Sequence, residues 1–226
     1  MSQESAKLIL EKVFAVLPEV KSLVDFGPGC GDWMAAADEL GVTDLKCYGL
    51  PYEVEIPKEL HGLVQPMPLA CSKWFEEADF RMPVKVRKAR YGLALCLEVG
   101  EHIEEESAET LIKSLVAASD FVLFSAAVPY QWGDGHINIR WPSYWARLFE
   151  AQGYKAADFL RYQLWDTPQD EVELHYKQNM ILYAKAERYT ELKLPEFDYA
   201  KVLNLVHPYL YCNIHGESYG DPDRKY

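Results

Sequence analysis

In VDFGPGCGDW, residues 24–33, an apolar run ends in an acid, and three glycines that alternate with other residues follow. An amphipathic pattern begins directly after them, which predicts a strand, a tight turn and a helix. Glycine adopts backbone angles closed to other residues and places no Cβ between the chain and a ligand. In an open α/β sheet, ligands bind at the carboxyl end of such a strand. The stretch therefore predicts a cofactor site.

Two apolar periodicities alternate on either side of this turn. Helices are predicted over residues 5–17, 32–40, 104–118, 142–152 and around 197–206. Strands are predicted over residues 21–26, 45–50, 74–80, 91–99, 121–128, 154–164 and 178–185. This alternation indicates an α/β fold, a mostly parallel sheet with helices on both faces. We interpret residues 1–226 as one domain, with a core over about 20–186 and an extension over 187–226 that ends in a polar tail.

The composition narrows the class of protein. The net charge of -12 argues against nucleic acids and anionic membranes as partners, because both attract basic surfaces. The five cysteines include no CxxC pair, which favours a reducing compartment over a disulfide framework or a structural zinc site. The first residues show no secretory signal and no apolar run reaches membrane-spanning length. We expect a cytoplasmic protein with a small-molecule partner; the composition leaves the oligomeric state open.

VDFGPGCGDW together with LCLEVGEHI (residues 95–103) resembles the class I S-adenosylmethionine-dependent methyltransferases. The glycines follow G-x-G-x-G, whereas the nicotinamide oxidoreductase pattern G-x-G-x-x-G fails because Asp32 stands at its last glycine. Residues 122–154 are similar to a bacterial small-molecule branch of this family, which has a G-H-x-N loop after the fifth strand. The pair QN (178–179) and the triplet VHP (206–208) are similar to that branch as well. The resemblance implies a Rossmann-like, seven-stranded, mostly parallel sheet with an antiparallel last strand, and S-adenosyl-L-methionine as cofactor.

The resemblance also implies cofactor contacts at the ends of the first, third and fourth strands. These residues are Asp25, Gly27, Gly29, Gly31, Asp79, Phe80, Leu97 and Glu98. The Asp79 carboxylate is expected to accept a hydrogen bond from the adenine amino group, with Phe80 packed on the ring. The family usually ends its second strand in an acid that binds the ribose, but here Pro51 stands there and Glu53 is the nearest acid. An inactive homologue that binds a partner or cofactor is therefore an alternative.

His136 is the candidate general base. Methyl transfer requires an aligned acceptor from which a proton is removed, and the histidine pKa near 6.5 suits that task. His136 follows the fifth predicted strand, where acceptors lie in this fold, and glycines on either side of it allow close approach to a ligand. The alternative is that His136 only fixes its loop by hydrogen bonding, through Asn138 for example.

Glu98, Glu101 and His102 form a second candidate group, which could bind a divalent ion, as in some quinone O-methyltransferases with an E-x-x-E-H phrase. We favour the interpretation without a metal, in which Glu101 and His102 cap the next helix and shape the pocket, because Mg²⁺ is seldom held by histidine. Tyr130 and Trp132 are candidate lid residues. Together with Asn138, Glu101 and His102 they complete the predicted acceptor site.

The sequence thus predicts an S-adenosylmethionine-dependent methyltransferase that acts on a small molecule, at an oxygen atom, by in-line displacement. The choice of oxygen rests on the histidine base and on the lack of an N-P-P-Y-type tetrad. The rival hypothesis is the inactive binding protein.

Overall fold

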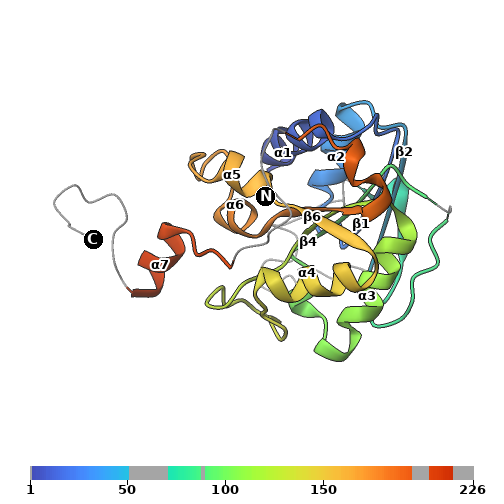
Figure 1. The fold of residues 1–226 in the computed structure, drawn as a ribbon. Coiled ribbons are helices and arrows are strands. Elements are labelled where there is room, and N and C mark those ends of the chain that lie inside the picture. The colour runs from blue at the N-terminus through green and yellow to red at the C-terminus, as the bar shows by residue number, and fades with distance from the viewer. Residues whose placement is uncertain (1, 51–70, 88–89, 195–203, 216–226) are drawn as a thin grey trace, which may run out of the picture.

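The computed structural model describes residues 2–50, 71–87, 90–194 and 204–215. Its centre is a seven-stranded sheet in the order β3-β2-β1-β4-β5-β7-β6 (Figure 1). The strands are β1 (Ser22–Phe26), β2 (Asp44–Gly49), β3 (Phe75–Glu77), β4 (Leu93–Leu97), β5 (Phe121–Ser125), β6 (Tyr154–Ala157) and β7 (Ile181–Lys185). The α-helices are α1 (Gln3–Val16), α2 (Asp32–Glu39), α3 (Glu105–Ala118), α4 (Pro142–Ala151), α5 (Leu160–Leu164), α6 (Leu174–Asn179) and α7 (Pro208–His215). The 3-10 helices are η2 (Ser72–Trp74), η3 (Gly100–His102) and η4 (Ala186–Glu191).

The strand directions confirm the predicted fold class. β1 pairs in parallel with β2 and β4, and β2 with β3 and β4 with β5 do the same. β7 is antiparallel to β5, and β6 is antiparallel to β7. The sheet is therefore Rossmann-like and mostly parallel, and its last strand in sequence runs against the others.

The central strands are buried on both faces, which explains their nearly continuous apolar sequences. Along β4, Leu93, Leu95 and Leu97 join the core beneath α1 and α2, while Ala94 and Cys96 join the opposite core with α3 and α4. Figure 1 shows α1 and α2 on one side of the sheet and α3 and α4 on the other. This three-layer packing fixes the ends of the strands, and hence the loops that follow them.

Helix ends follow signals in the sequence. The Ser2 hydroxyl accepts a hydrogen bond from the Ser5 N–H at 3.2 Å and so caps α1. Pro142 occupies the first turn of α4, where its missing N–H costs no hydrogen bond. None of the helices in the described ranges is long and apolar enough to cross a membrane.

Three predicted strands are wrong in part. Residues 154–164 form β6 and then α5, because Leu160 and Leu164 are one helical turn apart and both are buried. Gln178 and Asn179, predicted to begin the last strand, instead end α6. The third strand is much shorter than predicted and ends before Asp79. The helix expected around 197–206 falls largely outside the described residues, and the helix that is described begins at Pro208.

Candidate functional site

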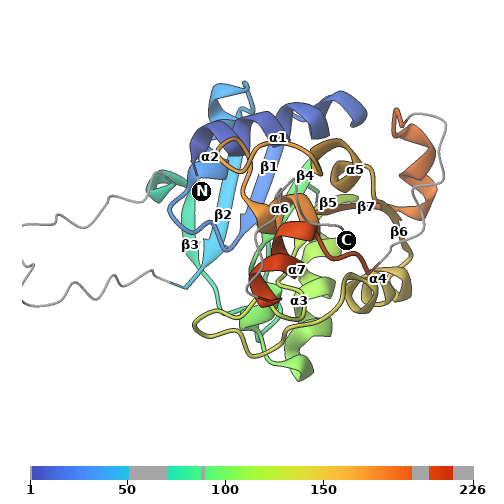
Figure 2. The same cartoon turned by 90° about the vertical axis from the view of Figure 1, so that its left-hand side faces the viewer.

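The candidate site lies at the carboxyl ends of β1, β4 and β5, where three loops meet. Since β6 is parallel to β5, the segment 158–180 leaves the sheet at this same edge and returns to it through β7. α5, α6 and α7 lie on the side that faces the viewer in Figure 2, the left-hand side of Figure 1. The site is thus bordered by elements from both halves of the chain.

The glycine turn has the conformation that its sequence predicts. Gly27, Gly29 and Gly31 have φ angles of +88°, +52° and +90°. A Cβ on Gly27 would lie 2.4 Å from Val99 Cγ2, and one on Gly31 would lie 2.7 Å from the Cys71 backbone nitrogen. Both positions therefore exclude any larger residue, and the turn presents bare backbone at the end of β1.

Asp25 is buried beside this turn. Its Oδ2 has no hydrogen-bond partner among the described residues. Burial, and then the charge of the neighbouring Cys71 thiol, raises the pKa of Asp25 to about 8. A buried polar atom without a partner is costly to keep, and such atoms are concentrated at functional sites.

The two residues predicted to contact adenine, Asp79 and Phe80, both contact other side chains of the protein. The Asp79 carboxylate forms a salt bridge with Arg81, with Oδ2 at 2.6 Å from Nη2, and this hydrogen bonding lowers the pKa of Asp79. Phe80 is buried, with its ring centroid 5.6 Å from that of Phe26. Adenine binding at Asp79 stays a prediction. It requires the Asp79 carboxylate to accept a hydrogen bond from adenine while it is also paired with Arg81. Pro51 and Glu53 lie outside the described residues.

Glu98 follows β4 in a strained conformation. Its φ of +54° is uncommon for a residue with a side chain, and such strain costs on the order of 1–3 kcal/mol and gathers at functional sites. The conformation is fixed by its N–H, which donates to the Ser125 carbonyl at 3.0 Å. Burial, and then the neighbouring Glu101, raises the pKa of Glu98 to about 7. Leu97, directly before it, is buried in the sheet.

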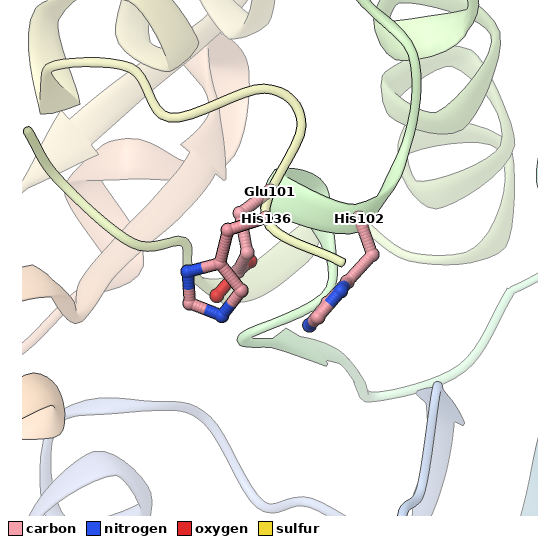
Figure 3. Close-up of side chains that lie close together, drawn as sticks. All are labelled: Glu101, His102 and His136. Carbon is pink, nitrogen blue, oxygen red and sulfur yellow. The ribbon is translucent and has the colours of Figure 1, made fainter. Parts of the chain in front are cut away.

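Glu101, His102 and His136 converge just beyond Glu98. One possible ligand atom from each lies within 4.8 Å of the others, and Figure 3 shows the three side chains turned toward one another. The Glu101 carbonyl accepts from the Ile137 and Asn138 N–H groups at 2.8 and 2.9 Å. The loop after β5 is thereby bound to η3, which places His136 beside residues of the preceding loop.

The Glu101 carboxylate is the unusual member of this cluster. The residue is fully buried, and neither carboxylate oxygen has a hydrogen-bond partner among the described residues. Burial raises its pKa to about 7, against the smaller lowering effects of the Glu101 and Ala127 backbone groups and of the Glu98 side chain. A buried carboxylate without partners is strongly destabilising unless a proton, a cation or a ligand compensates it.

Both histidine rings contact a backbone carbonyl through the same nitrogen, Nδ1. His102 Nδ1 lies 3.1 Å from the Gly135 carbonyl, and His136 Nδ1 lies 2.8 Å from the Gln131 carbonyl. A carbonyl only accepts, so in the neutral rings Nδ1 carries the proton and Nε2 carries the lone pair. The rings meet edge to face at 4.9 Å, and burial, followed by the proximity of His136, lowers the pKa of His102. Each ring is therefore prepared to act as a base or as a metal ligand.

The cluster fits a divalent cation. One carboxylate and two neutral imidazoles suit Mn²⁺, Fe²⁺, Co²⁺ or Zn²⁺ better than Mg²⁺. Metal-binding histidines commonly donate their other N–H to a backbone carbonyl, and both rings have that contact. The sequence-based interpretation without a metal did not anticipate this arrangement, because it grouped Glu101 and His102 with Glu98 and treated His136 separately.

The other predicted acceptor residues differ in exposure. Trp132 and Tyr130 are 78% and 53% exposed, so they project from the loop after β5. Asn138 is buried, and its side-chain oxygen accepts from Arg140, so it does not fix the His136 ring directly. Trp145, on α4, is buried in the core. The sequence did not single out Gln131, whose carbonyl contacts His136, or His175 and Tyr176, which interact electrostatically with Glu98.

No family model and no curated protein matches the sequence. Solved structures do match in fold. The structure of the small RNA methyltransferase HEN1 superposes with a TM-score of 0.52 at 15% identity, covering 80% of this chain and 25% of that one. A proposed O-methyltransferase from Nostoc punctiforme PCC 73102 gives 0.50 at 15%, with coverages of 80% and 55%.

The proposed methyltransferase of Haloferax volcanii, in its complex with the activator Trm112, gives a TM-score of 0.50 at 11% identity, with coverages of 80% and 89%. This chain thus spans about a quarter of HEN1 and about half of the Nostoc protein. At these identities the likeness establishes the methyltransferase-type Rossmann-like fold, and the chemistry must come from the site.

Proposed function

We propose that this chain is an S-adenosylmethionine-dependent methyltransferase that methylates a hydroxyl oxygen of a small molecule beside a divalent cation bound by Glu101, His102 and His136. The observation that supports it best is the buried Glu101 carboxylate, whose oxygens have no hydrogen-bond partner in the described part of the chain and lie close to two imidazoles. The glycine turn at the end of β1 is the complementary feature for the cofactor.

In this proposal, different residues of the chain bind the cofactor and the acceptor. S-adenosylmethionine would supply the electrophilic methyl group, and a divalent cation would supply Lewis-acid activation of the acceptor oxygen. Gly27, Gly29 and Gly31 admit the cofactor close to the backbone, and Glu98 borders its methionine part. Glu101, His102 and His136 set the position of the acceptor oxygen at the end of β5. Methyl transfer needs this alignment more than it needs a covalent step from the protein.

This proposal changes the role of His136. The sequence indicated a general base, whereas the proximity of Glu101 and His102 favours a ligand. The acceptor proton then leaves to solvent or to Glu98, the nearby acid whose pKa burial raises to about 7. The base role remains the alternative, in which activity needs no cation.

The first test separates cofactor binding from catalysis. Calorimetry with S-adenosylhomocysteine, on protein treated with EDTA, is expected to show binding that His136→Ala leaves nearly unchanged. Absence of binding, with no thermal shift at millimolar cofactor, would support the inactive homologue. Transfer of tritiated methyl groups into pools of small hydroxylated metabolites then identifies the acceptor.

The second test addresses the cation. Titration of the EDTA-treated protein with Co²⁺ is expected to produce visible absorption bands that Glu101→Gln and His136→Ala abolish. Glu109→Gln is the matched control, because Glu109 is exposed on α3 and, among the described residues, forms an ion pair with Lys113 alone. Full methyl transfer in EDTA, lost in His136→Ala, would instead establish His136 as the base.

A further inference from the structure

Three side-chain amides, Gln131, Gln178 and Asn179, form a cluster next to the site that the proposed function does not use. Gln131 Oε1 accepts three hydrogen bonds: from the Val128 N–H at 2.9 Å, from Asn179 Nδ2 at 2.9 Å and from Gln178 Nε2 at 3.3 Å. Gln178 and Asn179 are buried in α6. An oxygen that receives three donors is fixed from several directions, so the half-buried Gln131 has little freedom to move.

Gln131 is also the residue that orients His136. Its backbone carbonyl accepts from His136 Nδ1 at 2.8 Å, and its N–H donates to the Val128 carbonyl at 3.0 Å. The Gln131 side chain is therefore hydrogen-bonded to α6, whereas the Gln131 backbone carbonyl is hydrogen-bonded to the His136 ring. Immobilising the Gln131 side chain fixes the direction of its carbonyl, and with it the tautomer of His136.

The amide cluster extends to two further parts of the chain. Asn179 Nδ2 lies 3.4 Å from Glu98 Oε1, which links α6 to the strained end of β4. Gln178 Oε1 accepts from the His207 N–H at 2.6 Å, and the His207 ring nitrogen Nε2 lies 2.9 Å from the Trp165 carbonyl. The QN and VHP motifs of the sequence are thus bonded to each other, and the segment before α7 is joined to the site.

We propose that Gln131 is a positioning residue: its side-chain oxygen, bound by α6, fixes the Nδ1–H tautomer and the orientation of His136 and so prepares Nε2 for its partner. Gln178 and Asn179 are the donors that hold this oxygen, and Gln178 makes the C-terminal segment part of the same assembly. The inference rests on the proposed function in one respect, namely that His136 acts in the site.

A pair of variants separates positioning from packing. Gln131→Leu removes the acceptor, whereas Gln131→Glu keeps an oxygen that can accept from all three donors. In the metal-free protein, nitrogen-15 NMR of the imidazoles is expected to show His136 in the single Nδ1–H tautomer for wild type and Gln131→Glu. Gln131→Leu is expected to give a mixture of tautomers. Thermal unfolding of each variant checks that all are folded at the temperature of measurement.

A second readout uses Co²⁺ as the probe. Gln131→Leu is expected to weaken Co²⁺ binding by about 10- to 100-fold, the usual effect of removing a group behind a metal ligand. Gln131→Glu is expected to bind Co²⁺ at least as tightly as wild type, and both variants to bind S-adenosylhomocysteine within about 2-fold of it, because the glycine turn is untouched.

The outcomes distinguish the two proposals. If wild type binds no Co²⁺, the cation site is wrong, and the tautomer measurement still decides the role of Gln131. An unchanged single tautomer in Gln131→Leu overturns the positioning role. So does a Gln131→Glu variant that behaves like Gln131→Leu, since the acceptor oxygen would then be irrelevant.

Discussion

Glu101→Gln perturbs the site through a charge whose cost can be worked out from the structure. Burial raises the pKa of Glu101 from 4.5 to about 7. Since one pKa unit corresponds to about 1.4 kcal/mol, ionising this carboxyl in the metal-free protein costs about 3 kcal/mol of folding free energy. Below pH 4.5 the folded and unfolded states are both protonated, and the cost is absent.

The sign of the pH dependence follows from proton binding. Between pH 4.5 and about 7 the folded state retains a proton that the unfolded state has released. The free energy of unfolding therefore falls as the pH rises through this window, and it levels off above it. Glu98 contributes a similar fall in wild type, because burial, and then the charge of Glu101, raises its pKa to about 7. In Glu101→Gln this contribution is smaller, because the Glu101 charge is gone, so the difference between the two proteins reports Glu101 together with its effect on Glu98.

The assay is urea unfolding followed by tryptophan fluorescence, at pH 5 and pH 8, after treatment with EDTA. Wild type is expected to lose about 2.5 kcal/mol more than Glu101→Gln between these pH values, because at pH 5 part of the cost is already present. Glu109→Gln is expected to follow wild type. At pH 8, Co²⁺ at a hundred times its dissociation constant is expected to stabilise wild type by about 2.7 kcal/mol and Glu101→Gln not at all. If the free energy of unfolding falls equally with pH in wild type and in Glu101→Gln, the inference that burial raises the pKa of the Glu101 carboxyl is wrong.

Three further substitutions test neighbouring features. Gly31→Ala is expected to lower the melting temperature and weaken S-adenosylhomocysteine binding in calorimetry, because the new Cβ would lie 2.7 Å from the Cys71 nitrogen; unchanged affinity would contradict the turn geometry. Glu98→Gly relieves a φ of +54° and removes a half-buried acid, so the metal-free protein is expected to gain about 1 kcal/mol in urea unfolding; a loss would show that no strain is stored there. Arg161→Leu leaves the fully buried Asp158 without its ion-pair partner and is expected to cost about 3–5 kcal/mol, most of which the double variant with Asp158→Asn recovers.

Much of the fold follows from local patterns in the sequence. The glycine turn, the run over residues 91–99 and the stripe of α3 predict their elements because each is long or periodic enough to exclude alternatives. The segment between β6 and β7 was mispredicted because short apolar runs suit strands and helices equally. The spacing of Val172, Tyr176 and Met180, all buried and four residues apart, was the available indication of helix at α6.

The site was predictable in its parts and not in its assembly. His136 and the pair Glu101 and His102 were each singled out, but their convergence depends on backbone hydrogen bonds from Ile137 and Asn138 to Glu101, which no periodicity encodes. The same holds for Gln131, since an amide in a loop resembles any exposed glutamine until its partners are known. The lack of hydrogen-bond partners at the Glu101 carboxylate is likewise a property of tertiary structure alone.

The antiparallel course of β7 has a consequence for how such a protein can diversify. Because the chain leaves β6 and enters β7 at one edge, residues 158–180 form a detour that begins and ends at neighbouring points of the sheet. A connecting segment of this kind can be replaced by one of different length without altering the strand order. It carries α5 and α6, and it also reaches the far end of the chain through Gln178 and His207. A graft of this segment from a relative would therefore exchange α5 and α6 together and would have to include the residues around His207, which are bonded to it.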